Sequence, residues 1–187
     1  MRFFKERLGI ESLMLQNAKA IMRRDPRTAL GEILVSDVLS ESDKQSLLVE
    51  LRIFEVAVHL LLLIEICANR LDMEKVSYLW SKSVVLAAYS VAIDGNNEAA
   101  QADPMRLTEN AISYLGSAIE RRDARPRDVP LTFYYCQEFV RRVHGDHDII
   151  DMGAQAQRGE IFNVAKQILR NAESFLDAIQ KDYKITF

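Results

Sequence analysis

A chain of 187 residues is long enough to bury a single hydrophobic core without the help of disulfides or metal ions. Hydrophobic residues make up 49% of it and charged residues 27%, a balance that is typical of globular proteins and excludes disordered and fibrous ones. The net charge of −3 does not favour a dedicated nucleic-acid binder, although Lys and Arg gather in residues 1–30 and 121–142.

Cysteine usage and the N-terminal residues favour a cytoplasmic location. Cys67 and Cys136 both lie in apolar stretches, where we expect reduced and unlinked thiols. The first residues carry charges where a secretory signal would have an apolar run. The longest apolar run, 56–68, contains a His and a Glu and is shorter than the roughly 20 residues that cross a bilayer. We therefore expect no membrane segment.

The first third of the chain predicts two helices. Apolar residues recur at helical spacing from about Phe3 to Arg24, which predicts a first helix over that range. Asp25-Pro26 is typical of a helix start, with an N-cap residue followed by proline at the first helical position. We expect the second helix to run from there to about Leu39.

The middle of the chain predicts a buried helical hairpin. A third helix is expected from about Ser40 to Leu71, and its central turns are apolar on every side, which indicates that neighbouring helices enclose it. Asp72 is the expected cap of a fourth helix, which ends at about Gly95, a plausible C-terminal glycine. The two helices would form the centre of the core.

Three further helices are expected after residue 102. Asp103-Pro104 repeats the helix-start pattern, and an apolar stripe follows it through residues 111–119. Residues 121–130 have the prolines and alternating charges of an exposed loop, and a sixth helix covers about 131–143. The last helix, about 154–181, has apolar residues spaced by four and three. The sequence thus predicts an all-α fold: one domain, residues 1–187, folded as a helical bundle of about seven helices.

A histidine- and aspartate-rich loop is the densest group of chemically active side chains. It spans 144–151, and imidazole with carboxylate is a usual ligand mixture for zinc, iron or manganese. If the loop holds a metal ion, we expect the ligands to be His144, His147, Asp148 and Asp151, with Arg141 or Arg142 orienting a phosphate. The alternative is a solvated connector whose side chains cap the flanking helices.

Two helical enzyme families share small parts of this loop. His147-Asp148 is the dipeptide of the HD phosphohydrolases, but no other residues stand at the spacing of that family's remaining ligands. Arg142 and His147 have the Arg-x4-His spacing of the HEPN ribonucleases, in which this pair acts on the scissile phosphate. Gly145 lies between them and is expected to interrupt the helix that the pair requires. The chain is assigned to neither family, and its cofactors stay unknown.

Two acidic side chains in the third helix are noteworthy. Glu55 and His59 are four residues apart, so we expect them to face one another as an i,i+4 ion pair, with a catalytic dyad as the alternative. Glu65 lies within the apolar run, away from that polar strip. Burial there would be costly for a charge, so we expect a partner of opposite charge or a raised pKa.

Candidate contact residues lie in the sixth helix and at the C-terminus. Tyr134 and Tyr135 follow the Arg-rich loop and could form a recognition surface, since tyrosine is common at interfaces, although core packing explains most of the aromatic residues. The tail ends in apolar residues, of which Ile185 and Phe187 are candidates for contact with a partner or with a second copy. The alternative is that the tail folds back on its own bundle.

No Gly-rich phosphate loop, Cys-x-x-Cys pair or HExxH motif is present, so conventional nucleotide-binding and hydrolase chemistry is disfavoured. The composition therefore favours a helical interaction protein, such as a regulator, an adaptor or an assembly subunit. Its partner would be another protein or a second copy. The alternatives are a metal- or phosphate-handling hydrolase or ribonuclease built on the 144–151 loop, and a small-ligand sensor with a pocket between helices.

Overall fold

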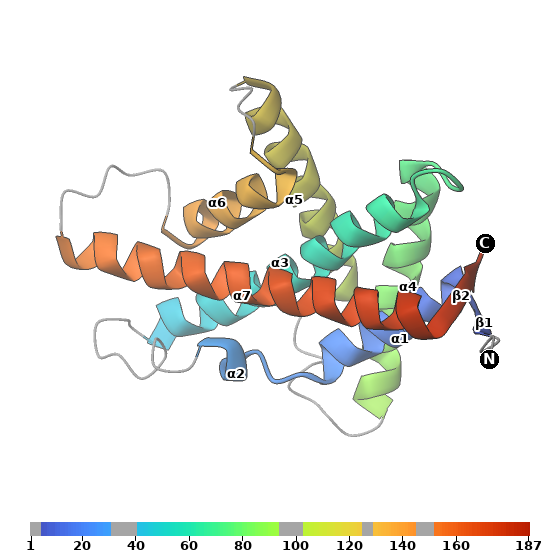
Figure 1. Cartoon of the computed structure of the whole chain (residues 1–187). Coiled ribbons are helices and arrows are strands. Elements are labelled where there is room, and N and C mark those ends of the chain that lie inside the picture. Colours follow the sequence, from blue (N-terminus) through green and yellow to red (C-terminus); the bar gives the residue numbers. More distant parts are fainter. Residues whose placement is uncertain (1–4, 31–40, 94–102, 125–128, 145–151) are drawn as a thin grey trace.

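The computed structural model describes residues 5–30, 41–93, 103–124, 129–144 and 152–187, and within these ranges the chain is almost entirely helical (Figure 1). Seven helices and two short strands are present there, which confirms the expected all-α helical bundle. In chain order they are β1 (Glu6–Gly9), α1 (Ile10–Arg23), α2 (Arg27–Leu30), α3 (Glu41–Cys67), α4 (Met73–Ile93), α5 (Pro104–Ala124), α6 (Leu131–His144), α7 (Met152–Asp182) and β2 (Tyr183–Thr186).

Helix α3 lies at the centre of the bundle and contacts α1, α4, α5, α6 and α7. Every residue from 51 to 63 is buried, as expected for a helix that is apolar on all sides. The helix ends at Cys67, four residues earlier than expected, because the backbone amides of Arg70 and Leu71 both turn back to the Cys67 carbonyl. Helix α4 follows α3 and contacts it, but it packs mainly against α1 and exposes one side, so only α3 of the expected buried hairpin is enclosed.

Aspartate caps fix three helix starts, as the sequence predicts. The Asp25 carboxylate accepts a hydrogen bond from the Arg27 amide at 2.9 Å and so precedes α2. Asp72 accepts one from Lys75 at 2.7 Å at the start of α4, and Asp103 accepts one from Met105 at 3.0 Å at the start of α5. The expected end of the second helix near Leu39 and the C-terminal Gly95 lie outside the described residues.

The other helices pack around this hairpin. Helix α1 lies mainly against α4, whereas α5 lies against α3 and α6 (Figure 1). The long helix α7 crosses over α3 and α6, and its buried residues keep the expected spacing of three and four. Ile112, expected on the buried stripe of α5, is instead 44% exposed, because the side of the helix that meets the core is the one with Ala111, Tyr114, Leu115 and Ala118.

The two ends of the described chain pair as a small parallel sheet, which the sequence did not predict. Strand β1 lies beside β2 with Glu6 opposite Tyr183 and Gly9 opposite Thr186. The first helix therefore begins at Ile10 and not at Phe3. Lys5 donates a further hydrogen bond to the Gln180 carbonyl at 2.7 Å, and Ile185 packs against the core. We call this pairing of β1 with β2 the terminal clasp.

Candidate interaction surface

The sequence-predicted metal site is only partly within the described chain. His144 is the last residue of α6, whereas His147, Asp148 and Asp151 lie outside the described residues. Among the residues that the structure does describe, no group of three or more His, Cys, Asp or Glu side chains is arranged to hold a metal ion. The metal-binding hypothesis for the loop therefore stays a sequence prediction.

The arginines expected to orient a phosphate beside that loop bind a buried carboxylate. Glu138 is fully buried and accepts hydrogen bonds from Arg141 at 2.6 and 2.9 Å and from Arg142 at 2.9 Å. Arg121 lies 3.4 Å from the same carboxylate. Burial alone would raise the pKa of Glu138, but the hydrogen bonds from both arginines outweigh it and lower the pKa. These arginines join α5 to α6 through Glu138.

Tyr134 and Tyr135, expected as possible surface residues, belong to the core instead. Tyr134 is buried against the exposed ring of Phe133, and Tyr135 is fully buried beside Tyr114. Their position on α6 turns both rings inward, so neither contributes to a recognition surface on this chain. Burial raises the pKa of the Tyr135 hydroxyl well above its ordinary range.

The C-terminal candidates divide between the two expected alternatives. Ile185 is half-buried and packs against the core from β2, so this part of the tail folds back on its own bundle. Phe187 follows the strand and is 51% exposed. The parallel pairing of β2 with β1 takes up the tail backbone that was expected to meet a partner.

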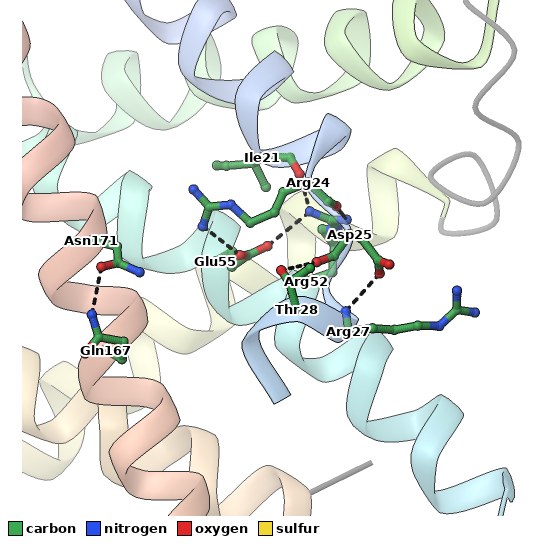
Figure 2. Close-up of polar contacts among 9 residues, drawn as sticks. All are labelled: Ile21, Arg24, Asp25, Arg27, Thr28, Arg52, Glu55, Gln167 and Asn171. Atoms are coloured by element: carbon green, nitrogen blue, oxygen red, sulfur yellow. Dashed lines mark hydrogen bonds and ion pairs between the residues drawn. The ribbon is translucent and has the colours of Figure 1, made fainter. Parts of the chain in front are cut away.

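The expected pair of Glu55 with His59 is not formed, and Glu55 binds two arginines instead. Arg52 of α3 lies 3.0 Å from the Glu55 carboxylate, and Arg24, just after α1, lies 3.2 Å from it (Figure 2). Arg52 also donates to the carbonyls of Ile21 and Arg24. Burial raises the pKa of Glu55 and lowers that of Arg52, while their ion pair opposes both shifts.

This network explains how α1 is attached to α3. Carbonyls in the last turn of a helix have no partner within the helix, and Arg52 supplies donors to two carbonyls at the end of α1. Figure 2 shows Arg52 and Glu55 pointing from α3 towards that end. The polar residues of α3 thus have a structural role, which explains their burial without a catalytic dyad.

Glu65 differs from the expectation in its location but not in its pKa. It lies on the exposed side of α3, near the end of the helix. Partial burial and the neighbouring Glu173 of α7 both raise the pKa of its carboxyl. The thiols of Cys67 and Cys136 are unlinked and buried, as expected, and burial raises the pKa of each to about 11.

Large exposed apolar side chains are concentrated on α4. Five of the eleven that the described chain exposes lie on this helix, while the other six are spread over several elements. Tyr78 is 61% exposed, Tyr89 is 64% exposed and Ile93 is 86% exposed. Their concentration on one helix distinguishes α4 from the other elements, because apolar side chains that are exposed singly need no explanation but clustered ones do.

Four of these side chains share one face of the helix. At 100° per residue, Tyr78, Leu86, Tyr89 and Ile93 fall within an arc of about 80°. The exposed Lys82 lies within the same arc, and the half-buried Val85 lies about 20° beyond its edge. We call these six residues the α4 face. The opposite side of the helix is packed into the bundle through Val76, Leu79, Trp80, Ser83, Val84, Ala87, Ala88 and Val91.

Two lysines give the α4 face its charge. The ammonium group of Lys75 lies 5.5 Å from the centre of the Tyr78 ring, within the range of a cation–π contact. Lys82 projects from the middle of the face. No Asp or Glu occurs between residues 75 and 93. The surface is thus apolar and aromatic with two positive charges, and the one acidic side chain of α4, Glu74, lies in the first turn of the helix.

Tyr78 and Tyr89 are exposed, although core packing was expected to explain most of the aromatic residues. Helix α4 has apolar residues on both sides, so the pattern alone does not tell which side meets α1 and α3. One signal was present in the sequence: Lys82 stands between Tyr78 and Leu86, and lysine is almost never fully buried.

By length and composition alone, α4 could also cross a membrane. Its most apolar window has a mean hydropathy of 1.3, and 44% of that window is buried inside the structure. A single helix of this kind is weak evidence, because the core helix of a soluble protein passes the same test.

Comparison of the chain with protein-family models, with curated proteins and with solved structures finds no match. The geometry of the α4 face is therefore the basis for a functional assignment.

Proposed function

We propose that this chain is a helical interaction protein and that the α4 face is its contact surface. The observation that carries the proposal is the clustering of Tyr78, Leu86, Tyr89 and Ile93 on one face of a helix whose other face is packed into the core. Covering four large side chains contributes roughly 1.5–3 kcal/mol for each that becomes fully buried, before the cost of association.

The character of these residues supports contact with a protein. Tyrosine is enriched at interfaces because its ring supplies apolar area at small cost in conformational entropy. Helix α4 is anchored along its length by α1, α3 and α5, so the face is presented on a rigid element. A rigid face loses little conformational freedom on binding, which favours affinity.

A photo-crosslinking experiment tests the proposal directly. The photoreactive residue p-benzoylphenylalanine would replace Tyr89 on the α4 face and, in a matched control, Arg170 on the exposed side of α7. Irradiation of cells that produce each variant is expected to give covalent protein adducts at position 89 and none at position 170. Absence of adducts at 89, or equal yields at both positions, would refute the proposal.

The enzymatic and sensor alternatives stay predictions from the sequence. The loop at 144–151 lies almost wholly outside the described residues, and Arg141 and Arg142 are bound to Glu138. None of the contacts within the described chain favours either alternative over an interaction surface.

A further inference from the structure

We propose that the partner of the α4 face is a second copy of this chain, whose own α4 packs antiparallel across a two-fold axis between residues 85 and 86. This inference rests on the function proposed above and identifies the partner. A two-fold interface uses the same patch on both copies, so the patch must be complementary to itself. The α4 face meets that requirement in one orientation of the helices.

The antiparallel register follows from the midpoint of the face. The face extends from Tyr78 to Ile93, and its centre lies between Val85 and Leu86. Pairing about this centre sets Tyr78 against Ile93 of the other copy and Val85 against Leu86, each pair occurring twice. The outer and central pairs then join apolar or aromatic side chains, whereas Tyr89 meets the charged Lys82.

Charge distinguishes this orientation from the parallel one. Pairing about the same centre places Lys82 of one copy opposite Tyr89 of the other, where the ammonium group can lie over the ring as Lys75 already does over Tyr78. In a parallel arrangement in register, Lys82 would face Lys82. Glu74, the one acidic residue of α4, lies eight residues from Lys82, about 12 Å along the helix, and so offsets little of that repulsion.

The face is also long enough to pair two helices. Helix α4 has 21 residues and so spans about 31 Å. Packed helices lie about 8–10 Å apart, which brings the exposed rings of each copy onto the backbone and side chains of the other. A contact of one helix per copy is small, and it corresponds to a weak, concentration-dependent dimer.

Site-directed crosslinking tests the partner and the orientation together. With a short bismaleimide, Leu86→Cys is expected to give crosslinked dimers by itself, because residue 86 lies next to the axis. Tyr78→Cys alone is expected to give none, since its counterpart lies 15 residues away along the helix, or about 22 Å. A mixture of Tyr78→Cys and Ile93→Cys chains is expected to crosslink.

The native thiols make the unmodified chain a suitable control. Cys67 and Cys136 are buried, and burial raises the pKa of each to about 11, so neither is expected to react. Arg170→Cys on α7 provides an exposed thiol away from the face. Crosslinking of Tyr78→Cys alone would overturn the antiparallel arrangement, and failure of both Leu86→Cys and the mixture would overturn self-pairing.

Sedimentation equilibrium of the unmodified chain provides a second measurement. Between about 1 and 200 µM the average mass is expected to rise from 21.4 kDa towards twice that value. Leu86→Glu places a carboxylate next to the two-fold axis, where it would face the same carboxylate of the other copy, and is expected to stay monomeric over the same range. Its exposed position means that the helical circular dichroism should not change. A constant monomer mass for the unmodified chain would overturn the inference.

The composition of the photo-adducts at position 89 distinguishes failure of this inference from failure of the proposed function. An adduct with the mass of two chains supports self-pairing. An adduct that contains only a different protein retains the α4 face as a contact surface but overturns the second copy as its partner. Absence of any adduct would overturn both this inference and the proposed function.

Discussion

His59 shows how burial controls the chemistry of a single side chain. It lies on α3 between the rings of Trp80 and Phe175, with 5% of its surface exposed and no hydrogen-bond partner for Nδ1. Burial, and to a smaller extent the nearby Arg24, lowers its pKa to about 3. The imidazole therefore stays neutral at physiological pH, and with so low a pKa it binds a proton too weakly to act as a general base, so its role is in the core.

We expect His59 to make the stability of the protein depend on pH. The folded pKa lies below the unfolded value of 6.5, so below pH 6.5 only the unfolded chain binds the proton and stability falls. At pH 5 this loss is about 2 kcal/mol relative to pH 8. Urea unfolding of the unmodified chain and of His59→Leu at both pH values measures it. The difference in free energy of unfolding between the unmodified chain and His59→Leu should change by about 2 kcal/mol from pH 8 to pH 5. The same difference at both pH values would contradict the lowered pKa of His59.

Two buried carboxylates show that similar burial can have opposite results. Glu55 has a raised pKa because burial outweighs its contacts with Arg52 and Arg24. Glu138 has a lowered pKa because the hydrogen bonds from Arg141 and Arg142 outweigh burial. The number and geometry of the arginine contacts, and not burial alone, decide the direction. Helical spacing could have indicated the partners three and four residues away, but not Arg24, which lies 31 residues from Glu55.

At the scale of the element, local chemistry was predictable and long-range pairing was not. Asp25, Asp72 and Asp103 each cap the helix that the sequence assigned to them, because a capping contact involves residues two or three positions apart. Strand β1 was missed, and its residues were expected to be helical. Its partner β2 lies about 177 residues away, where no periodic pattern in the sequence can reveal the pairing. The contact face of α4 was missed for a related reason: its orientation depends on α1 and α3.

The terminal clasp predicts that β1 loses its hydrogen bonds when β2 is removed. Four-residue strands are not stable alone, so the amides of residues 6–9 depend on β2 for their hydrogen bonds. Truncation after Asp182 is expected to make these amides exchange with solvent at nearly unprotected rates, while those of α3 keep their protection. Hydrogen exchange followed by mass spectrometry measures both. Equal protection of residues 6–9 in the full and truncated chains would show that β2 does not hold β1.

At the scale of the whole molecule, the fold places two kinds of surface on opposite sides of one helix. Helix α4 contributes Trp80 to the core, where its indole donates to the Val56 carbonyl of α3 at 3.1 Å, and presents Tyr78 and Tyr89 outward. The same helix therefore stabilises the bundle and forms the proposed interface. Binding at the α4 face would add to the stability of the bundle, because only the folded chain presents the face.

That linkage predicts a melting temperature that depends on protein concentration. If two copies pair through α4, raising the concentration a hundredfold stabilises each folded chain by about 1 kcal/mol, which corresponds to about 2–4 °C for a domain of this size. Leu86→Glu is expected to melt at a temperature independent of concentration, because its carboxylate would be buried in the dimer beside the same carboxylate of the other copy. Differential scanning calorimetry at both concentrations measures the two proteins side by side. A constant melting temperature for the unmodified chain, or an equal shift in both, would show that pairing through α4 does not stabilise the fold.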